Sequence, residues 1–150
     1  MRLIVQRVDH ARVFVNRKIQ SAITHGLLVL CGIEHGDTMK DIEWLAGKLC
    51  RLRIFNDTNG VMNLSVDEAG GEILLVSQFT LHASTKKGNR PSYIRAMEPI
   101  EAEALFMEFV NKVKDNTSRP VNTGAFGSHM CIDLVNNGPV TIMIDSRLRE

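Results

Sequence analysis

Short apolar runs and alternating apolar residues predict strands in the first third of the chain. Residues 3–5 form an apolar run, and Val13 and Val15 follow in an imperfect period of two. This pattern is typical of a β-hairpin or of two short strands. Residues 26–33 form a longer apolar run with glycines near both ends, which favours a strand buried on both faces.

Two helices are predicted by apolar residues that recur every three or four positions. The first follows Thr38, which resembles a capping box together with Asp41 three residues later. The second begins near Glu98 and Pro99, since proline is favoured in the first turn of a helix. The expected core-facing stripes are Ile42, Leu45, Leu49 and Leu52 in the first helix, and Ala102, Leu105, Phe106, Phe109 and Val113 in the second.

Further strands are predicted in the middle and at the end of the chain. Residues 70–81 form a second buried strand, and residues 130–135 and 140–146 form two more, separated by the sequence NNGP. Strand–helix–strand alternation is largely missing from this order. Two helices and at least five strands indicate a mixed α/β fold, in which the helices pack on one side of a sheet or barrel.

Size and composition are those of one ordinary globular domain, which we assign to residues 1–150. The net charge of +1 does not indicate a nucleic-acid-binding protein, although a local basic patch would suffice for that function. Charged residues interrupt the N-terminal segment, so we expect no signal peptide. No apolar run reaches the ~20 residues that span a membrane. We therefore expect a soluble, cytoplasmic protein without membrane contact.

Three cysteines at wide spacings, without a CxxC pair, argue against a disulfide framework and against a zinc site. Cys31 and Cys131 lie in apolar runs, so we expect buried, reduced thiols. None of the five histidines has the spacing of a metal motif. No GxSxG sequence marks a nucleophilic serine, but a Ser-His-Asp arrangement stays open. We expect neither a metal nor a cofactor.

The sequence Ser77–Thr80 ends an apolar strand with three side chains that can form hydrogen bonds. The end of a strand can offer hydroxyl groups and free backbone N–H groups to a ligand. Thr80 could act as a nucleophile, and the amides around Phe79 could form an oxyanion hole. The same residues could equally cap the end of the sheet, because serine and threonine often bond to nearby backbone.

Two other polar segments have both a structural and a functional interpretation. Residues 136–139, NNGP, suit a turn that needs no function. A Gly-Pro bond can also be cis at low cost, and rigid carbonyl groups could then read stereochemistry by steric exclusion. Residues 84–93 form either a solvated loop or, through Lys86, Lys87 and Arg90, a site for phosphates.

Residues 77–81 read SQFTL, and residues 136–141 read NNGPVT. With these two motifs the chain strongly resembles the D-aminoacyl-tRNA deacylase family of the bacterial and eukaryotic type, whose signatures are SQFTL and NxGPVT. The resemblance covers essentially the whole chain, including QRV, GLLVLCGI, LRIFND, GVMNLSV, KKGNRPSY and TGAFGSHM. Phe79 and Val140 resemble the D-specific branch rather than a sister group that deacylates misacylated L-alanine.

The resemblance implies a compact β-barrel-like fold and a homodimer. It implies that the Gly138-Pro139 bond is cis and that this motif, which begins at Asn136, enters the active site of the other subunit. The carbonyl groups would then exclude the side chain of an L-aminoacyl group, a selection by rejection that glycine would partly escape. In the family, an arginine matching Arg7 helps to fix the motif, and a methionine matching Met130 packs near the terminal adenosine.

The implied reaction is hydrolysis of the ester between a D-amino acid and the 3′ end of its tRNA. The backbone N–H of Phe79, with Ser77 and Gln78 nearby, would hold the developing oxyanion. The tRNA 2′-OH is expected to assist, and Thr80 is the alternative nucleophile. Because the ester is already activated, water and an oxyanion hole could suffice without a triad.

The chain departs from the family pattern at a few positions, which concern tuning more than identity. Asp9 and His10 replace small residues, Asn137 fills the variable motif position, and His129 replaces an aspartate. Two other functions remain as alternatives. One is nucleic-acid binding without catalysis, which a mobility shift with duplex DNA would test. The other is hydrolysis of small N-acyl or peptide substrates, which a substrate screen would test.

Overall fold

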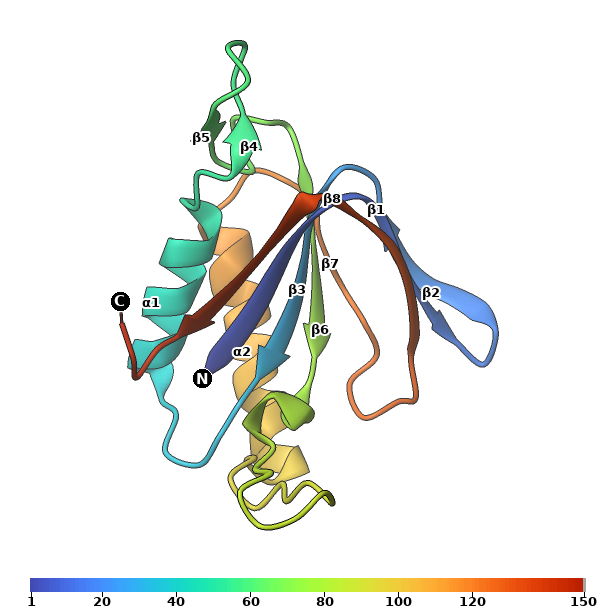
Figure 1. The fold of residues 1–150 in the computed structure, drawn as a ribbon, viewed down its shortest axis with the longest axis vertical. Coiled ribbons are helices and arrows are strands. Elements are labelled where there is room, and N and C mark those ends of the chain that lie inside the picture. The colour runs from blue at the N-terminus through green and yellow to red at the C-terminus, as the bar shows by residue number, and fades with distance from the viewer. Residues whose placement is uncertain (150) are drawn as a thin grey trace.

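A computed structural model describes residues 1–149 of the chain (Figure 1). In this range a six-stranded sheet has the order β2-β1-β3-β6-β7, and β8 pairs with the other edge of β1. A separate small hairpin contains β4 and β5. The elements are β1 (Arg2–Val15), β2 (Lys18–Ile23), β3 (Gly26–Gly32), α1 (Met39–Cys50), β4 (Phe55–Asn56), β5 (Met62–Leu64), β6 (Glu72–Ser77), the 3₁₀ helix η1 (Phe79–His82), α2 (Pro99–Asp115), β7 (Val121–Thr123) and β8 (Cys131–Asp145).

The first apolar residues belong to one long strand, β1, so the prediction of a hairpin or two short strands within them was wrong. The hairpin partner of β1 is β2, which begins at Lys18. Leu3 and Val5 face one hydrophobic core, whereas Val8 and Val13 face another. The pairing with β8 shifts register on both sides of Val8. The strand therefore passes from one core to the other between Val5 and Val8.

Two parallel strand pairs also differ from the sequence prediction, which expected little strand–helix–strand alternation. The strand β3 is buried, as expected, and lies parallel to β6 with α1 in the connection. The strand β7 lies parallel to β6 after α2. The predicted strand over residues 70–81 is also too long, because β6 ends at Ser77 and the chain turns into η1.

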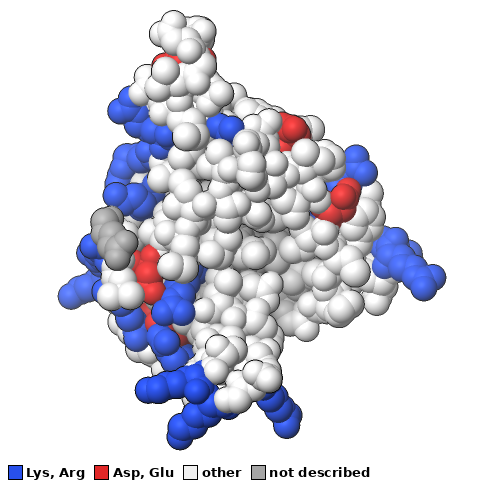
Figure 2. Space-filling view, in the orientation of Figure 1, with Lys and Arg blue, Asp and Glu red and all other residues white. Residues whose placement is uncertain are grey.

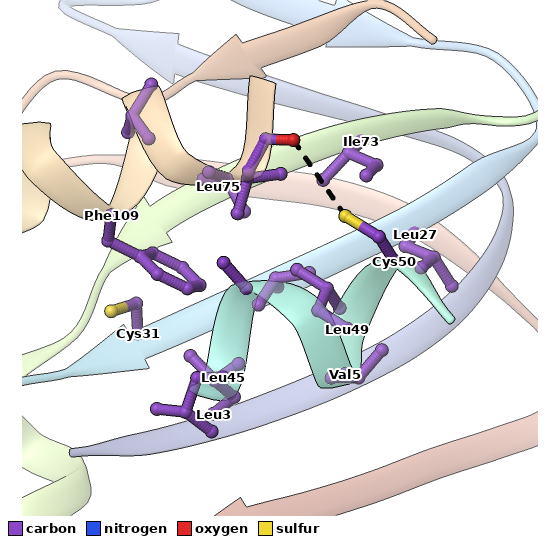
Figure 3. Close-up of a cluster of buried hydrophobic side chains, with 14 of the residues drawn as sticks. Leu3, Val5, Leu27, Cys31, Leu45, Leu49, Cys50, Ile73, Leu75 and Phe109 are labelled. Carbon is purple, nitrogen blue, oxygen red and sulfur yellow. Dashed lines mark hydrogen bonds between the residues drawn. The ribbon is translucent and has the colours of Figure 1, made fainter. Parts of the chain in front are cut away.

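Both helices lie on the same face of the sheet, as predicted (Figure 1). Thr38 precedes α1. Its backbone N–H and its hydroxyl donate hydrogen bonds to the Asp41 carboxylate, at 2.8 and 3.0 Å. Leu45 and Leu49 of α1 meet Phe109 of α2 over the strands (Figure 3). Burial of each such side chain stabilises the fold by about 1.5–3 kcal/mol. Leu52, predicted as part of the first stripe, lies beyond the end of the helix.

The second core lies on the face of the curved sheet opposite the helices. Its residues are Val8, Ala11, Val13, Ile23, Leu28, Leu74 and Val76. The sheet nearly closes where β2 approaches β7. There the Asn122 side-chain amide donates a hydrogen bond to the Ala22 carbonyl at 2.9 Å. The mixed α/β class and the barrel-like sheet with two helices are thus confirmed.

The C-terminal strands predicted on either side of NNGP are one element, β8. On β1, Gln6 pairs with Thr141 and Val8 pairs with Asn136. Residues 137–140 therefore stand opposite the single residue Arg7. We call residues 137–140 the Gly-Pro bulge. The prediction of two separate strands was wrong, because both halves of β8 pair with the same long partner.

The cysteines divide between the core and the surface. Cys31 and Cys50 are buried free thiols, and burial raises the pKa of Cys50 to about 11. Cys131 is exposed, which contradicts the prediction of a buried thiol. The physical reason is alternation along β8, since Ile132 and Leu134 face the second core and Cys131 points outward. None of the helices within residues 1–149 combines the length and apolar character needed to cross a membrane.

Candidate active site

A pocket of about 520 Å³ lies at the carboxyl end of β6. Its walls come from that strand end, from the segment that leads into α2, and from the segment before β8. The lining residues are Cys31, Ile33, Val76, Ser77, Gln78, Phe79, Tyr93, Ala96, Met97, Glu98, Pro99, Ala102, Phe126, Gly127, Ser128, His129, Met130 and Ile132. Ser77, Gln78, Phe79 and Met130, all predicted from sequence, are thus brought together here.

The SQFT segment leaves the sheet at the edge of this pocket. The backbone N–H of Gln78 still donates to the Cys31 carbonyl at 2.7 Å. The next bonds belong to η1, in which the N–H of Leu81 donates to the Gln78 carbonyl at 3.3 Å. Within residues 1–149, the N–H groups of Phe79 and Thr80 donate to no backbone carbonyl. Two adjacent amides, of which that of Phe79 belongs to a lining residue, therefore have no backbone acceptor within the described residues.

Thr80 lies behind the pocket edge rather than in the lining. Its hydroxyl oxygen accepts a hydrogen bond from the side-chain amide of Gln78. Nucleophilic threonine needs a base that takes its proton. Among residues 1–149, no histidine or carboxylate forms a hydrogen bond with this hydroxyl. The geometry therefore links Thr80 to the position of Gln78 more directly than to nucleophilic attack.

Aromatic and sulfur-containing side chains line the rest of the pocket. The Phe79 ring meets the Tyr93 ring edge to face, with centroids 5.1 Å apart and planes at 73°. Met130 is half-buried on the opposite segment, where a Cβ on Gly124 would lie 2.7 Å from its sulfur. Such walls suit a planar base or an apolar aminoacyl side chain.

The Gly-Pro bulge is held at its base by side chains of β1 and β8. Its Gly138-Pro139 peptide bond is cis, and Gly138 has φ +123°. The Asn136 side-chain amide donates to the Val140 carbonyl at 2.9 Å and to the Arg7 carbonyl at 3.0 Å. Gly138 and Pro139 are nevertheless exposed. The bulge is thus anchored on one side and presented to the exterior on the other.

Arg7 lies beneath the bulge and is 8% exposed. Its Nε donates to the Asn137 carbonyl at 3.3 Å, and its Nη1 donates to the Ile54 carbonyl at 2.6 Å. The Asn56 side chain accepts a third bond at 3.3 Å. The guanidinium therefore joins the bulge to the loop that follows α1, as a rigid fork can do.

Within one chain, the Gly-Pro bulge and the pocket lie apart. Ser77 pairs with Cys31, and Cys31 pairs with Leu3 of β1. The bulge follows directly after Asn136, which pairs with Val8. Five positions along β1 correspond to roughly 17 Å. The structure therefore does not bring the two sequence motifs together within one chain.

A buried polar network behind the pocket was not singled out by the sequence. The Glu34 carboxylate accepts hydrogen bonds from Arg95 at 2.6 and 3.1 Å, and its other oxygen lies 3.6 Å from Nδ1 of His82. Glu34 is 3% exposed and His82 is fully buried. His82 belongs to η1, and Arg95 precedes pocket residues Ala96 and Met97. Glu34 thus connects two pocket walls, through long-range contacts without a sequence signature.

Within the described range, no three His, Cys, Asp or Glu residues are placed to hold a metal ion. The polar groups of the pocket include the hydroxyls of Ser77 and Ser128, the Gln78 amide, the Glu98 carboxylate and the His129 ring, together with backbone N–H groups at its edge. Their arrangement can orient a polar substrate and stabilise a developing negative charge on oxygen.

Comparisons with known proteins agree with one another. Residues 4–145 match the family model described as D-Tyr-tRNA(Tyr) deacylase. The D-aminoacyl-tRNA deacylases of Parabacteroides distasonis and Flavobacterium johnsoniae are 58% and 52% identical over 150 residues, which is all of each chain. A solved structure titled c-Myc DNA Unwinding Element Binding Protein has a TM-score of 0.92 and 38% identity, covering 97% of this chain and 98% of that one.

A second solved structure, of a probable eukaryotic D-amino acid tRNA deacylase, has a TM-score of 0.79 and 20% identity. It covers 95% of this chain and 97% of that one, and supports the fold alone. The family match and the full-length identity together decide the relationship. The chain belongs to the D-aminoacyl-tRNA deacylase family.

Proposed function

We propose that this protein is a D-aminoacyl-tRNA deacylase. It hydrolyses the ester bond of D-aminoacyl-tRNA and releases the free amino acid and tRNA. The observation that carries this function is the pair of free amides at Phe79 and Thr80, beside a pocket of about 520 Å³, in a chain of this family. Glycyl-tRNA is a further substrate in this proposal, since glycine has no side chain to be rejected.

The reaction needs little side-chain chemistry. The terminal adenosine lies against Met130, and the ester carbonyl oxygen points to the amides of Phe79 and Thr80. Water adds to the carbonyl carbon, and these amides stabilise the oxyanion. The bond between the carbonyl carbon and the 3′-oxygen then breaks, and the 3′-oxygen takes up the proton that the added water loses, with assistance from the neighbouring 2′-OH. Ser77 and Gln78 orient the ester, and the Thr80 hydroxyl holds the Gln78 amide.

Chiral selection in this proposal comes from the Gly-Pro bulge of a partner subunit. The bulge is exposed, anchored by Arg7 and Asn136, and distant from the pocket of its own chain. In a homodimer, Gly138 and Pro139 of one subunit enter the other pocket. Their carbonyl groups exclude an L side chain, and a D side chain points away from them.

We place the enzyme in the cytoplasm, where its tRNA substrate is found, and treat residues 1–150 as one domain. Three free cysteines, two of them buried, support a reducing compartment. Both hydrophobic cores share β1, which supports a single folding unit.

The first experiment compares deacylation of D-Tyr-tRNA and L-Tyr-tRNA. We expect rapid hydrolysis of the D-form and little of the L-form. Equal rates for both forms, or no turnover of the D-form, would overturn the proposed function.

A mixed dimer tests whether the filter acts between subunits. One subunit carries Gly124→Phe, which is designed to block its pocket, because a side chain at Gly124 must displace the lining residues Met130 and Val76. The other carries a defective bulge, Gly138→Ala. We expect the mixed dimer, purified through two different tags, to reject L-Tyr-tRNA better than the Gly138→Ala homodimer. Unchanged L-activity per open pocket would show that each bulge serves its own chain.

Nucleic-acid binding without catalysis is the second candidate. The favouring observation is the structural similarity to a protein titled as a binder of a DNA unwinding element, at 38% identity. A mobility shift with duplex DNA tests this function. Tight, salt-resistant DNA binding together with no D-Tyr-tRNA hydrolysis would favour it over the deacylase.

A further inference from the structure

We propose that residues 84–92, which we call the cationic loop, bind phosphates of the tRNA 3′ strand where it leaves the pocket. The inference rests on the proposed deacylase function and adds a contact outside the reacting ester. The loop carries three exposed cations, Lys86, Lys87 and Arg90.

The cationic loop begins and ends at the rim of the pocket. The loop lies between η1, which contains Phe79, and Tyr93. The rings of Phe79 and Tyr93 are in contact with each other. Paired backbone bonds between Ser84 and Ser92, at 2.8 and 2.9 Å, close its base. The residues between them therefore project from the rim, at the lower end of the molecule beside the start of α2 (Figure 1).

The charges of this loop are not neutralised by the protein. Within residues 1–149, none of its three cations forms a salt bridge, whereas Arg2, Arg95 and Arg147 pair with carboxylates. Figure 2 shows Lys and Arg side chains gathered at the lower end, where the loop lies. Three free cations are a local positive patch on a chain whose net charge is only +1. Such a patch suits a polyanion.

The neighbouring rim favours an unpaired RNA strand over a duplex. Phe79 is 56% exposed and Tyr93 is 40% exposed, although both are aromatic. Proteins bind single-stranded nucleic acids by combining base stacking on aromatic rings with cations along the backbone. With the terminal adenosine in the pocket, the preceding nucleotides pass this rim. Their phosphates then come within reach of the cationic loop.

The test variant is Lys86→Gln/Lys87→Gln/Arg90→Gln. The matched control is Arg17→Gln/Lys18→Gln/Lys114→Gln, which removes the same residue types from exposed positions away from the pocket rim. Hydrolysis of D-Tyr-tRNA is measured as kcat/KM between 0.05 and 0.5 M salt, values chosen as roughly the range in which counterion release dominates. The same enzymes are assayed on D-tyrosyl-adenosine, which has the ester but no further phosphates.

For the loop variant, we expect kcat/KM on D-Tyr-tRNA to fall roughly ten- to a hundredfold near 0.1 M salt. The slope of log kcat/KM against log salt should become shallower by about 2, since each phosphate contact on a single strand contributes about 0.7. Activity on D-tyrosyl-adenosine and the thermal unfolding temperature should match the wild type. The control should retain the wild-type slope.

Three results would overturn the inference. They are an unchanged slope in the loop variant, an equal loss in the control, or a parallel loss on D-tyrosyl-adenosine. The proposed function fails separately, if the wild-type enzyme does not hydrolyse D-Tyr-tRNA. The two failures are therefore distinguishable in one set of assays.

Discussion

Nε of Arg7 lies 3.3 Å from the carbonyl oxygen of Asn137, and the bond fixes the first residue of the Gly-Pro bulge to β1. Arg7 is buried, so its hydrogen bonds form away from competing water. The same guanidinium also binds the Ile54 carbonyl at 2.6 Å. The position of the bulge therefore depends on one side chain that also holds the loop after α1.

Arg7→Lys should reduce both stability and chiral selection. A lysine retains the charge but lacks the planar fork, so it leaves at least one buried carbonyl unpaired. We expect the free energy of unfolding in urea to fall by about 1–3 kcal/mol. The ratio of D-Tyr-tRNA to L-Tyr-tRNA hydrolysis should also fall. Arg12→Lys, on the exposed part of the same strand, should change neither quantity, and an equal effect there would contradict this role of Arg7.

Gly138→Ala should displace the Gly-Pro bulge. A Cβ at Gly138 would lie 2.7 Å from Cγ2 and 2.9 Å from the backbone N of Val140, at a φ of +123°. The segment must move, at a cost of about 1–3 kcal/mol from overpacking. We expect measurable hydrolysis of L-Tyr-tRNA by this variant.

Gly60→Ala provides the matched control for that substitution. Gly60 also has a positive φ, +79°, but a Cβ there meets nothing within 4 Å. Gly60→Ala should lower the free energy of unfolding by about 1 kcal/mol, because alanine is less stable than glycine in the left-handed backbone conformation. Chiral selection should be unchanged. If Gly138→Ala behaved like Gly60→Ala in both assays, close packing around Gly138 would have no role in selection.

Thr80→Val should leave most of the catalytic rate. The valine removes the hydroxyl that the Gln78 amide binds, but it retains the backbone N–H that we assign to the oxyanion. We expect kcat for D-Tyr-tRNA to fall by less than about tenfold, compared with losses of about 10⁴ or more when a catalytic nucleophile is removed. Single-turnover kinetics of Thr80→Val, with Thr80→Ser as the control, distinguish a hydroxyl that positions Gln78 from one that acts as the nucleophile. If Thr80→Val lost about 10⁴ or more in rate while Thr80→Ser remained active, Thr80 would be identified as the nucleophile.

The buried network behind the pocket should make the protein less stable in acid. Burial lowers the pKa of His82 below its ordinary value of 6.5, so this ring stays neutral to a lower pH in the folded protein than in the unfolded chain. In the unfolded chain, the same ring binds a proton as the pH falls through about 6.5. The unfolded state then binds more protons, so the free energy of unfolding should decrease as the pH falls from about 6.5.

Glu34 adds to this trend at lower pH. Burial alone would raise its pKa, but the hydrogen bonds of Arg95, together with the charges of His82, Arg147 and Arg95, outweigh burial and lower the pKa below 4.5. Its contribution to stability is therefore present above about pH 4.5 and is lost as the pH falls through the lower, folded pKa.

Urea unfolding between pH 5 and 7 measures the His82 contribution, as a slope of up to about 1.4 kcal/mol per pH unit. His82→Gln should flatten that slope even if it also lowers overall stability. The exposed His129→Gln should leave the slope unchanged. A wild-type slope in His82→Gln would show that another group titrates in this range.

The sequence alone determined the helices, the buried central strands and the family motifs. These features depend on local information, because a stripe of apolar residues on α1 or α2 needs only the spacing of neighbouring positions. Likewise, the apolar run that ends in SQFTL predicted the buried strand β6, although that strand ends at Ser77 and not at Leu81. Of the residues that line the pocket from other segments, Met130 followed from the family resemblance, whereas Ala96 and Phe126 followed from no local pattern.

Only the tertiary structure decided how those pieces meet. NNGP reads locally as a turn, but long-range pairing with β1 makes residues 137–140 a bulge in one strand opposite Arg7. Cys131 lies in an apolar stretch, yet the pleat of β8 turns it outward. Glu34 and His82 are ordinary polar residues until folding buries them together. Burial and strand register are set by contacts between residues distant in the chain, so spacing along the sequence cannot specify them.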